Sequence, residues 1–166
     1  VSDMLFLAQA DNNQLIPEQQ ALDLAEEVHK VLEFFEAWAE EQAVALRFVG
    51  SPSPVTGDPL MLRRAISNLL SNAIRYTPAG QAVTIQLSES AETVRLVVEN
   101  PGTPIAAEHL PRLFDRFYRV DPSRQRKGEG SGIGLAIVKS IVGAHHGSVA
   151  AQSDLRSTRF IVVLPK

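Results

Sequence analysis

The longest hydrophobic pattern in the chain recurs at steps of three and four residues, which is the spacing of one face of an α-helix. Such periods predict helices over residues 1–10, 24–42, 59–75 and 133–144. The third helix begins with Asp58-Pro59, a side-chain acceptor at the N-cap followed by proline at the first helical position. The fourth ends before Gly147, a residue type that commonly follows a helix.

Shorter alternating or continuous apolar runs predict β-strands. They cover residues 44–49, 83–88, 94–98, 149–153 and 159–164. The linker over residues 89–93 has the length of a hairpin loop, and a short helical piece is expected over residues 108–117. This order of clustered strands and interspersed helices predicts an α+β protein, built as a two-layer α/β sandwich.

Length and composition fit one globular domain, alone or with a short appendage. The 166 residues carry a formal net charge of −3, without the basic excess typical of nucleic-acid binders. No apolar run reaches the roughly 18–20 residues of a membrane span, and no signal peptide is visible. The lack of cysteine excludes disulfides and thiolate metal sites. Because the chain opens with Val1 inside an apolar stretch, we expect it to be a piece of a longer protein.

Polar side chains follow one face of the third predicted helix. Asn68, Asn72 and Arg75 stand at positions i, i+4 and i+7, so they share a stripe opposite the apolar face. Amide oxygens suit a hard cation, and a guanidinium suits phosphate. A solvated helix face would show the same spacing.

Glycine-rich sequence leads directly into the fourth predicted helix. The stretch reads Gly128-Glu129-Gly130-Ser131-Gly132-Ile133-Gly134-Leu135. Glycines let a backbone approach a ligand closely, and the N–H groups at a helix start attract phosphate. Neither a Walker A loop nor a Rossmann loop matches, because no Gly-Lys-Ser/Thr follows and no strand immediately precedes. A flexible loop tip is the alternative interpretation.

Two further segments lie in the long irregular region between these elements. The first, Asn100-Pro101-Gly102-Thr103-Pro104, follows a strand end, where a short polar side chain can bond a nucleobase edge; a plain turn would look the same. In the second, Phe114-Asp115-Arg116-Phe117-Tyr118-Arg119, two aromatic rings three residues apart could seat a mobile lid. A basic run, Arg124, Arg126 and Lys127, follows and suits phosphate, although a core contact plus solvated charges would also explain it.

Taken in order, these four segments resemble the N, G1, F and G2 boxes of histidine kinase catalytic domains, which belong to the Hsp90, gyrase B, histidine kinase and MutL superfamily. The resemblance covers residues 20–166. Three stretches are most similar to the heavy-metal (copper/silver) sensor kinases: Arg75-Tyr76-Thr77-Pro78, Glu99-Asn100-Pro101-Gly102 and residues 113–119. It implies the Bergerat ATP-binding fold, with a mixed sheet of about five strands on three helices. Residues 1–14 would then be the end of the second dimerisation (DHp) helix.

The resemblance also implies ATP and Mg²⁺ as cofactors and assigns roles to residues. Asn68 and Asn72 would be the catalytic residues and Mg²⁺ ligands, Arg75 would lie near the phosphates, and Tyr76 would pack near the adenine or ribose. Phe114 and Phe117 would seat the lid. The remaining expected nucleotide-binding residues are Asn100, Gly102, Ile105, Arg119, Gly130, Ser131, Gly132, Ile133, Gly134 and Leu135. Residues 121–129 are expected to be mobile without nucleotide.

Three positions bear on this assignment. Asn100 stands where the family usually has an Asp that accepts from adenine, Pro104 replaces a usual glycine, and Glu99 is the competing acceptor if the register differs by one. A neutral acceptor binds more weakly than a charged one. A degenerate interaction module without nucleotide is therefore one alternative. A protein-serine kinase or ATPase is another, but it would need Glu at Asn68 to activate water.

Phosphotransfer in this family goes to a histidine of the DHp domain and then to a response regulator, so both are implied partners. None of His29, His109, His145 and His146 stands in a Ser-His-Glu-Leu-like context, and His145 and His146 suit a cationic or capping role at a helix end. We therefore expect a fragment that binds ATP but is inactive in cis. The fragment is expected to be monomeric, and its parent homodimeric, in the bacterial inner membrane with this domain on the cytoplasmic face.

Overall fold

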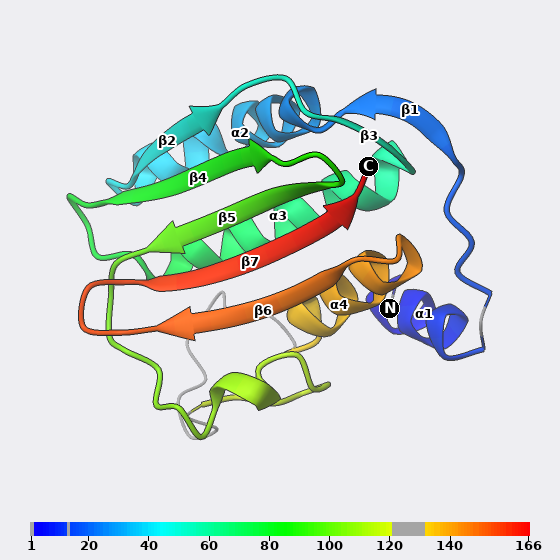
Figure 1. The fold of residues 1–166 in the computed structure, drawn as a ribbon. Helices are drawn as coiled ribbons and strands as arrows, with labels where there is room; N and C mark the ends of the chain where they lie inside the picture. The colour runs from blue at the N-terminus through cyan, green and yellow to red at the C-terminus, as the bar shows by residue number, and fades with distance from the viewer. Residues whose placement is uncertain (1, 13, 121–131) are drawn as a thin grey trace.

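A five-stranded mixed sheet, covered on one face by helices, forms the body of the protein in a computed structural model (Figure 1). The structure describes residues 2–12, 14–120 and 132–166. The strand order is β2-β4-β5-β7-β6, with β2 parallel to β4 and every other pair antiparallel. The strands are β2 (Ala45–Gly50), β4 (Ala82–Glu89), β5 (Thr93–Asn100), β6 (Ser148–Ser153) and β7 (Thr158–Pro165). The covering helices are α2 (Leu24–Glu41), α3 (Pro59–Tyr76) and α4 (Gly134–Ala144). The predicted two-layer α+β sandwich is confirmed.

Helix α3 begins where the sequence predicts, because Asp58 caps it. Its carboxylate accepts from the backbone N–H groups of Leu60 and Met61 at 3.0 and 3.2 Å. The apolar face is buried along its length, at Leu62, Ala65, Ile66, Leu69, Leu70, Ala73 and Ile74. Complete burial of one leucine such as Leu69 contributes roughly 1.5–3 kcal/mol. The burial of this face leaves the amide stripe of the same helix at the edge of the core.

Two predicted details of the fold are wrong. Strands β1 (Gln20–Asp23) and β3 (Pro54–Gly57) form a separate antiparallel pair that the pattern did not reveal. Each has four residues, too few for a period-two signal, and the second is bounded by proline and glycine. In place of the helix expected over residues 108–117, the structure has one 3₁₀ turn, η1 (Leu110–Arg112). A helix cannot extend through Phe117, because the φ of this residue is +61°.

His145 joins the end of α4 to the start of α3. Its Nδ1–H donates to the carbonyl oxygen of Ile141 at 2.8 Å, and its Nε2 accepts from the backbone N–H of Asp58 at 3.0 Å. Since one ring nitrogen donates and the other accepts, the ring is neutral. Of the two expected roles, the capping one fits the structure: His145 is the C-cap residue of α4, and its buried imidazole also joins two helix ends.

Replacing His145 by alanine should lower the free energy of unfolding by roughly 1–3 kcal/mol, because the N–H of Asp58 would be left without its acceptor beside the core. His146 is exposed and has a φ of +62°, so His146→Asn is the matched control and should change stability little. Urea denaturation measures both variants. Equal stabilities of the two variants would contradict a structural role for the buried ring.

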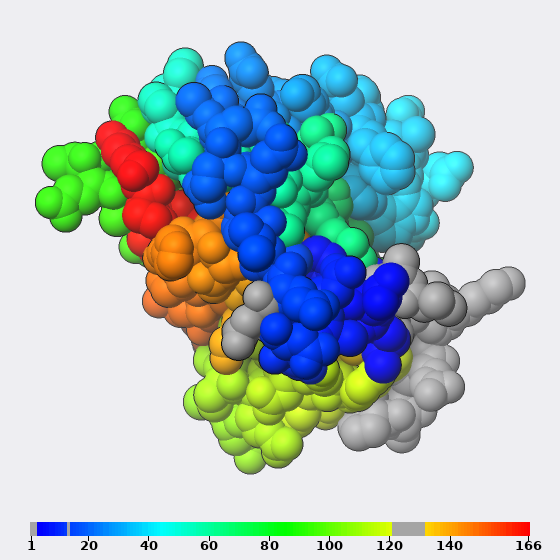
Figure 2. Space-filling model, turned by 90° about the vertical axis from the view of Figure 1, so that its right-hand side faces the viewer, coloured from blue at the N-terminus to red at the C-terminus, as the bar shows by residue number. Residues whose placement is uncertain are grey.

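Helix α1 (Ser2–Asp11), predicted over residues 1–10, packs against α4 and lies against the yellow-green segment that follows β5 (Figure 2). Leu7 is 1% exposed, and ion pairs join Asp3 to Arg64 and Asp11 to Arg116. The guanidinium of Arg64 also lies 4.4 Å from the ring centroid of Phe6. No helix in the described part of the chain is long and apolar enough to cross a membrane.

Candidate functional site

The amide stripe of α3 meets the first residue of α4. The side-chain N–H of Asn68 donates to the carbonyl oxygen of Gly134 at 3.3 Å, and a Cβ built on Gly134 would lie 3.9 Å from the amide carbon of Asn68. Asn72 and Arg75 are half-buried on the turns that follow. Two segments that are 66 residues apart in the chain are thus brought side by side.

The start of α4 has no side-chain cap among the described residues. Its N-cap residue is Ile133, which offers no side-chain acceptor to the first-turn N–H groups within the described residues. Such N–H groups, together with the helix dipole, attract phosphate. Ile133 itself is 2% exposed and fixes the helix start in the core. Amide oxygens on one side and first-turn N–H groups that no described side chain caps on the other make this corner suitable for a metal-bound phosphate.

The segment after β5 closes on the other end of α3. Gly102 has a φ of +145°, and a Cβ built on it would lie 2.8 Å from the carbonyl oxygen of Tyr76. Asn100 is 4% exposed, and its side-chain N–H₂ donates to the carbonyl oxygen of Pro101 at 2.9 Å. Because the nitrogen of this amide is engaged, its oxygen Oδ1 is the group available to accept from a ligand. Tyr76, at the end of α3, has a half-exposed side chain, and its backbone carbonyl is the part that lies next to Gly102.

Adjacent residues of β5 point to opposite faces of the sheet. Asn100 is buried on the helix side, whereas Glu99 accepts from the hydroxyl of Ser157 at 2.7 Å and pairs with Arg159 at 3.5 Å on the open side. The alternation of side chains along a strand requires this arrangement. The position of Glu99, on the opposite face of the sheet from Asn68 and Asn100, argues against the competing assignment of this residue as the adenine acceptor.

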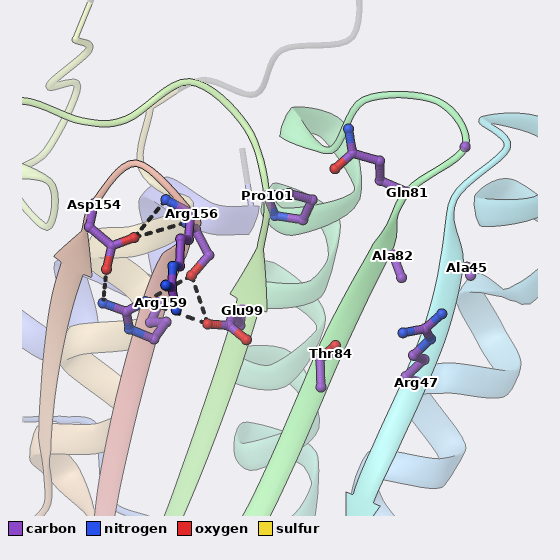
Figure 3. A pocket seen from close by; sticks show the side chains of 12 residues that line it. Ala45, Arg47, Gln81, Ala82, Thr84, Glu99, Pro101, Asp154, Arg156 and Arg159 are labelled. Atoms are coloured by element: carbon purple, nitrogen blue, oxygen red, sulfur yellow. Dashed lines mark hydrogen bonds and ion pairs between the residues drawn. The ribbon is translucent and has the colours of Figure 1, made fainter.

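Glu99 lines a hollow of about 580 Å³ on the open face of the sheet (Figure 3). Arg159 lies between Glu99 and Asp154 there, and Arg47 faces them from β2. The pKa of Asp154 is lowered to about 2, first by the backbone N–H of Arg156 and then by the side chain of Arg159. This network stabilises the β6–β7 turn and lies across the sheet from Asn68 and Asn100, so it is separate from the candidate site.

Phe117 and Gly132 connect the two ends of the irregular region. The N–H of Phe117 donates to the carbonyl oxygen of Gly132 at 2.8 Å. A Cβ on Gly132 would lie 3.1 Å from the Cα of Phe117 and 3.7 Å from Nε of Arg119. Of the two rings expected to seat a lid, only Phe114 packs inward, with its ring edge-on to Phe160 at 6.0 Å. The ring of Phe117 is 56% exposed, so this residue is attached through its backbone instead.

The other expected residues divide into two groups. Ile105 and Leu135 are partly buried against the core, and the N–H of Ile105 donates to the hydroxyl of Ser153 at 2.9 Å. Gly130, Ser131 and the segment 121–129, with the basic run, lie outside the described residues. The sequence pattern did not reveal that Ser153 of β6 accepts this hydrogen bond, because no spacing of residues in the sequence links β6 to the segment after β5.

The donor set decides which metal the site can hold. In the described ranges, no three His, Cys, Asp or Glu side chains are grouped to hold a metal ion. Mg²⁺ usually keeps several waters and is held by a few protein oxygens together with substrate phosphates. The amide oxygens of Asn68 and Asn72 fit that mode of binding and do not fit an all-protein cage.

Comparison with known proteins agrees with this geometry. Residues 57–166 match the family model of the histidine kinase-, DNA gyrase B-, and HSP90-like ATPases. The chain is 71% identical over 165 residues to the sensor histidine kinase CusS of Escherichia coli (strain K12) and 63% identical over 170 residues to the probable sensor kinase SilS of Salmonella typhimurium. These matches cover 99% and 100% of this chain but only 34% of each relative, so the chain spans about a third of their length.

Among solved structures, full-length ShkA in complex with AMPPNP superposes with a TM-score of 0.87 and 26% sequence identity, over 99% of this chain and 34% of that one. The segment that matches the family model, residues 57–166, includes Asn68, Asn72, Asn100 and the helix that begins at Gly134. The fold and the family model therefore agree over the whole candidate site. The chain belongs to the family of histidine kinase-, DNA gyrase B-, and HSP90-like ATPases.

Proposed function

We propose that this domain binds ATP with Mg²⁺ between α3, the start of α4 and the segment after β5, and supplies the γ-phosphate to a histidine of its parent kinase. The hydrogen bond from Asn68 to Gly134 carries this proposal, because it holds the amide stripe beside a helix start that no described side chain caps. The structural likeness to ShkA, a protein solved with AMPPNP, supports it.

Each described side chain has a chemical task in this scheme. Asn68 and Asn72 offer amide oxygens to Mg²⁺, and Arg75 offers its guanidinium to phosphate oxygens. The Oδ1 of Asn100 accepts from the adenine amino group, and the ring of Tyr76 covers the base or ribose. Mg²⁺, when bound, neutralises charge on the phosphates. Arg119, Gly132 and Leu135 lie at or near the start of α4, where they would border the phosphates; the same role is proposed for Gly130 and Ser131.

Asn68 separates phosphotransfer from hydrolysis. An amide has no useful basicity, so it cannot take a proton from water as a carboxylate could. Positioning and electrostatic stabilisation then remain as the contributions of the protein, as is general for phosphoryl transfer. The ATPase and serine kinase alternatives are less well supported for this reason.

We extend the proposal to the longer protein, since the relatives are about three times the length of this chain. Residues 1–14 would be the end of the second DHp helix, and the missing part would supply the acceptor histidine. A response regulator would receive the phosphate, and copper or silver ions would be the stimulus of a homodimeric inner-membrane kinase. None of the four histidines here serves as the acceptor in this scheme, so this piece alone would not phosphorylate itself.

Titration with a fluorescent ATP analogue, with and without Mg²⁺, tests the function. Saturable binding that strengthens with Mg²⁺ is expected. No binding at millimolar nucleotide would support the degenerate interaction module instead, and steady phosphate release without an acceptor would support the ATPase. Addition of a separate DHp domain should give phosphohistidine only when this domain is present.

Replacing Asn100 by alanine should weaken ATP binding about five- to ten-fold and leave the weaker binding of GTP unchanged, because only adenine donates to Oδ1. Thr103→Ala, an exposed position three residues along the chain, is the matched control. Competition of ATP and GTP against the fluorescent analogue measures both. An equal loss for the two nucleotides would remove Asn100 from base recognition.

A further inference from the structure

The turn at Phe117 is a strained piece of backbone at the edge of the site. Phe117 has a φ of +61°, a conformation that costs about 1 kcal/mol for a residue with a Cβ. Its side chain is exposed, so apolar packing of its own ring cannot account for that cost. Something in the surrounding structure must therefore hold this conformation.

Tyr118, the next residue, is fixed by contacts that the sequence pattern does not predict. Its hydroxyl is hydrogen-bonded to Nδ1 of His109, and the two ring centroids lie 5.9 Å apart. The guanidinium of Arg112 covers the face of the Tyr118 ring at 4.7 Å. Tyr118 thus lies between two side chains of the η1 turn.

The η1 turn is itself anchored in the core. The N–H of His109 donates to the carbonyl oxygen of Ala106 at 2.9 Å, and Leu113 and Phe114, directly after the turn, pack against the buried residues. The position of His109 is therefore fixed by the core. Its hydrogen bond to Tyr118 in turn fixes the residue that directly follows Phe117.

We propose that His109 and Tyr118 are a positioning pair for the nucleotide site, an inference that rests on the proposed function. The pair holds Phe117 in its left-handed conformation, and the N–H of Phe117 then holds Gly132 at 2.8 Å. Gly132 is two residues from Gly134, whose carbonyl oxygen binds Asn68. Neither ring touches the nucleotide in this scheme; both act through the backbone of Phe117.

Tyr118→Phe is the most direct test, because it removes one hydroxyl and keeps the ring under Arg112. Hydrogen exchange of the Phe117 amide should become about five-fold faster, and affinity for the ATP analogue should fall about five-fold, the size expected for one neutral hydrogen bond. Amides of the α3 core should exchange as before. Ala107→Ser, an exposed position two residues before His109, is the control and should change neither quantity.

Variants of His109 separate positioning from simple packing. His109→Leu should speed exchange of the Phe117 amide and lower the affinity for the ATP analogue as Tyr118→Phe does. His109→Asn keeps a polar atom near the place of Nδ1, so its exchange rate and affinity should be close to those of the unaltered chain. The double variant His109→Leu/Tyr118→Phe should be no worse than either single one.

Unchanged exchange at Phe117 in Tyr118→Phe would overturn the inference, as would a His109→Asn variant no better than His109→Leu. If the unaltered chain binds no nucleotide at all, the proposed function fails, but the exchange measurements still test the pair because they need no ligand. Altered exchange with unchanged affinity would also overturn it, since the pair would then be structural only.

Discussion

Replacement of Asn72 by alanine should weaken binding of Mg-ATP roughly 10- to 100-fold, the cost of removing one hydrogen-bonding or coordinating contact to a charged ligand. Asn72 is half-buried on the same face of α3 as Asn68, whose hydrogen bond to Gly134 holds this face beside the start of α4. In the part of the chain that the structure describes, its side chain makes no hydrogen bond that folding would lose. Thermal unfolding of the nucleotide-free variant should therefore stay close to that of the parent.

The matched control is Ser67→Ala, a half-buried polar residue on the same helix. Calorimetric titration with Mg-AMPPNP measures both variants, and a repeat in EDTA separates the metal contribution. If Asn72→Ala binds as tightly as the control, the amide stripe is only a solvated helix face. If the loss is the same with and without Mg²⁺, Asn72 contacts the nucleotide and does not serve as a metal ligand.

Gly102→Ala, which adds one methyl group beside the end of α3, should lower both stability and nucleotide affinity. Two penalties combine, a positive φ of +145° and a Cβ only 2.8 Å from the backbone oxygen of Tyr76. Together they should lower the free energy of unfolding by roughly 2–4 kcal/mol. Any relaxation must move the end of α3 or the segment after Asn100, so nucleotide affinity should fall as well.

Gly80→Ala provides the control for this prediction. Gly80 has a φ of +88°, but no described atom lies within 4 Å of a Cβ built on it, so this variant carries strain without a clash. Its cost should be about 1 kcal/mol, and its nucleotide affinity should be unchanged. Urea denaturation of the two variants gives the difference. Equal destabilisation would show that the segment after β5 does not press on the end of α3.

Local signals in the sequence were sufficient for the main elements of the fold. The cap at Asp58 and the period of the following apolar residues predict α3 and, with it, the stripe of Asn68, Asn72 and Arg75. Alternation along residues 83–88 predicts that Val83, Ile85 and Leu87 of β4 enter the core, and all three are buried. Such features depend on near neighbours in the chain, so they can be read without tertiary contacts.

Features that depend on distant contacts could not be predicted in this way. The cross-link of His145 to Asp58 spans 87 residues, and the neutral state of its ring follows only from where its two partners lie. The left-handed turn at Phe117 breaks a segment whose composition suits a helix. Strands β1 and β3 are too short for a pattern and exist because each pairs with the other.

Strand β5 has one further consequence for nucleotide selection. Val94, Leu96 and Val98 are buried, so a shift of the strand by one residue would turn these three out of the core. The same shift would exchange Glu99 and Asn100, presenting a carboxylate to the base and an amide to Arg159. In the proposed function, three aliphatic side chains that touch no ligand thus set which of two adjacent polar residues faces the adenine. A one-residue deletion in the 90–92 loop would favour the shifted register and so oppose this arrangement.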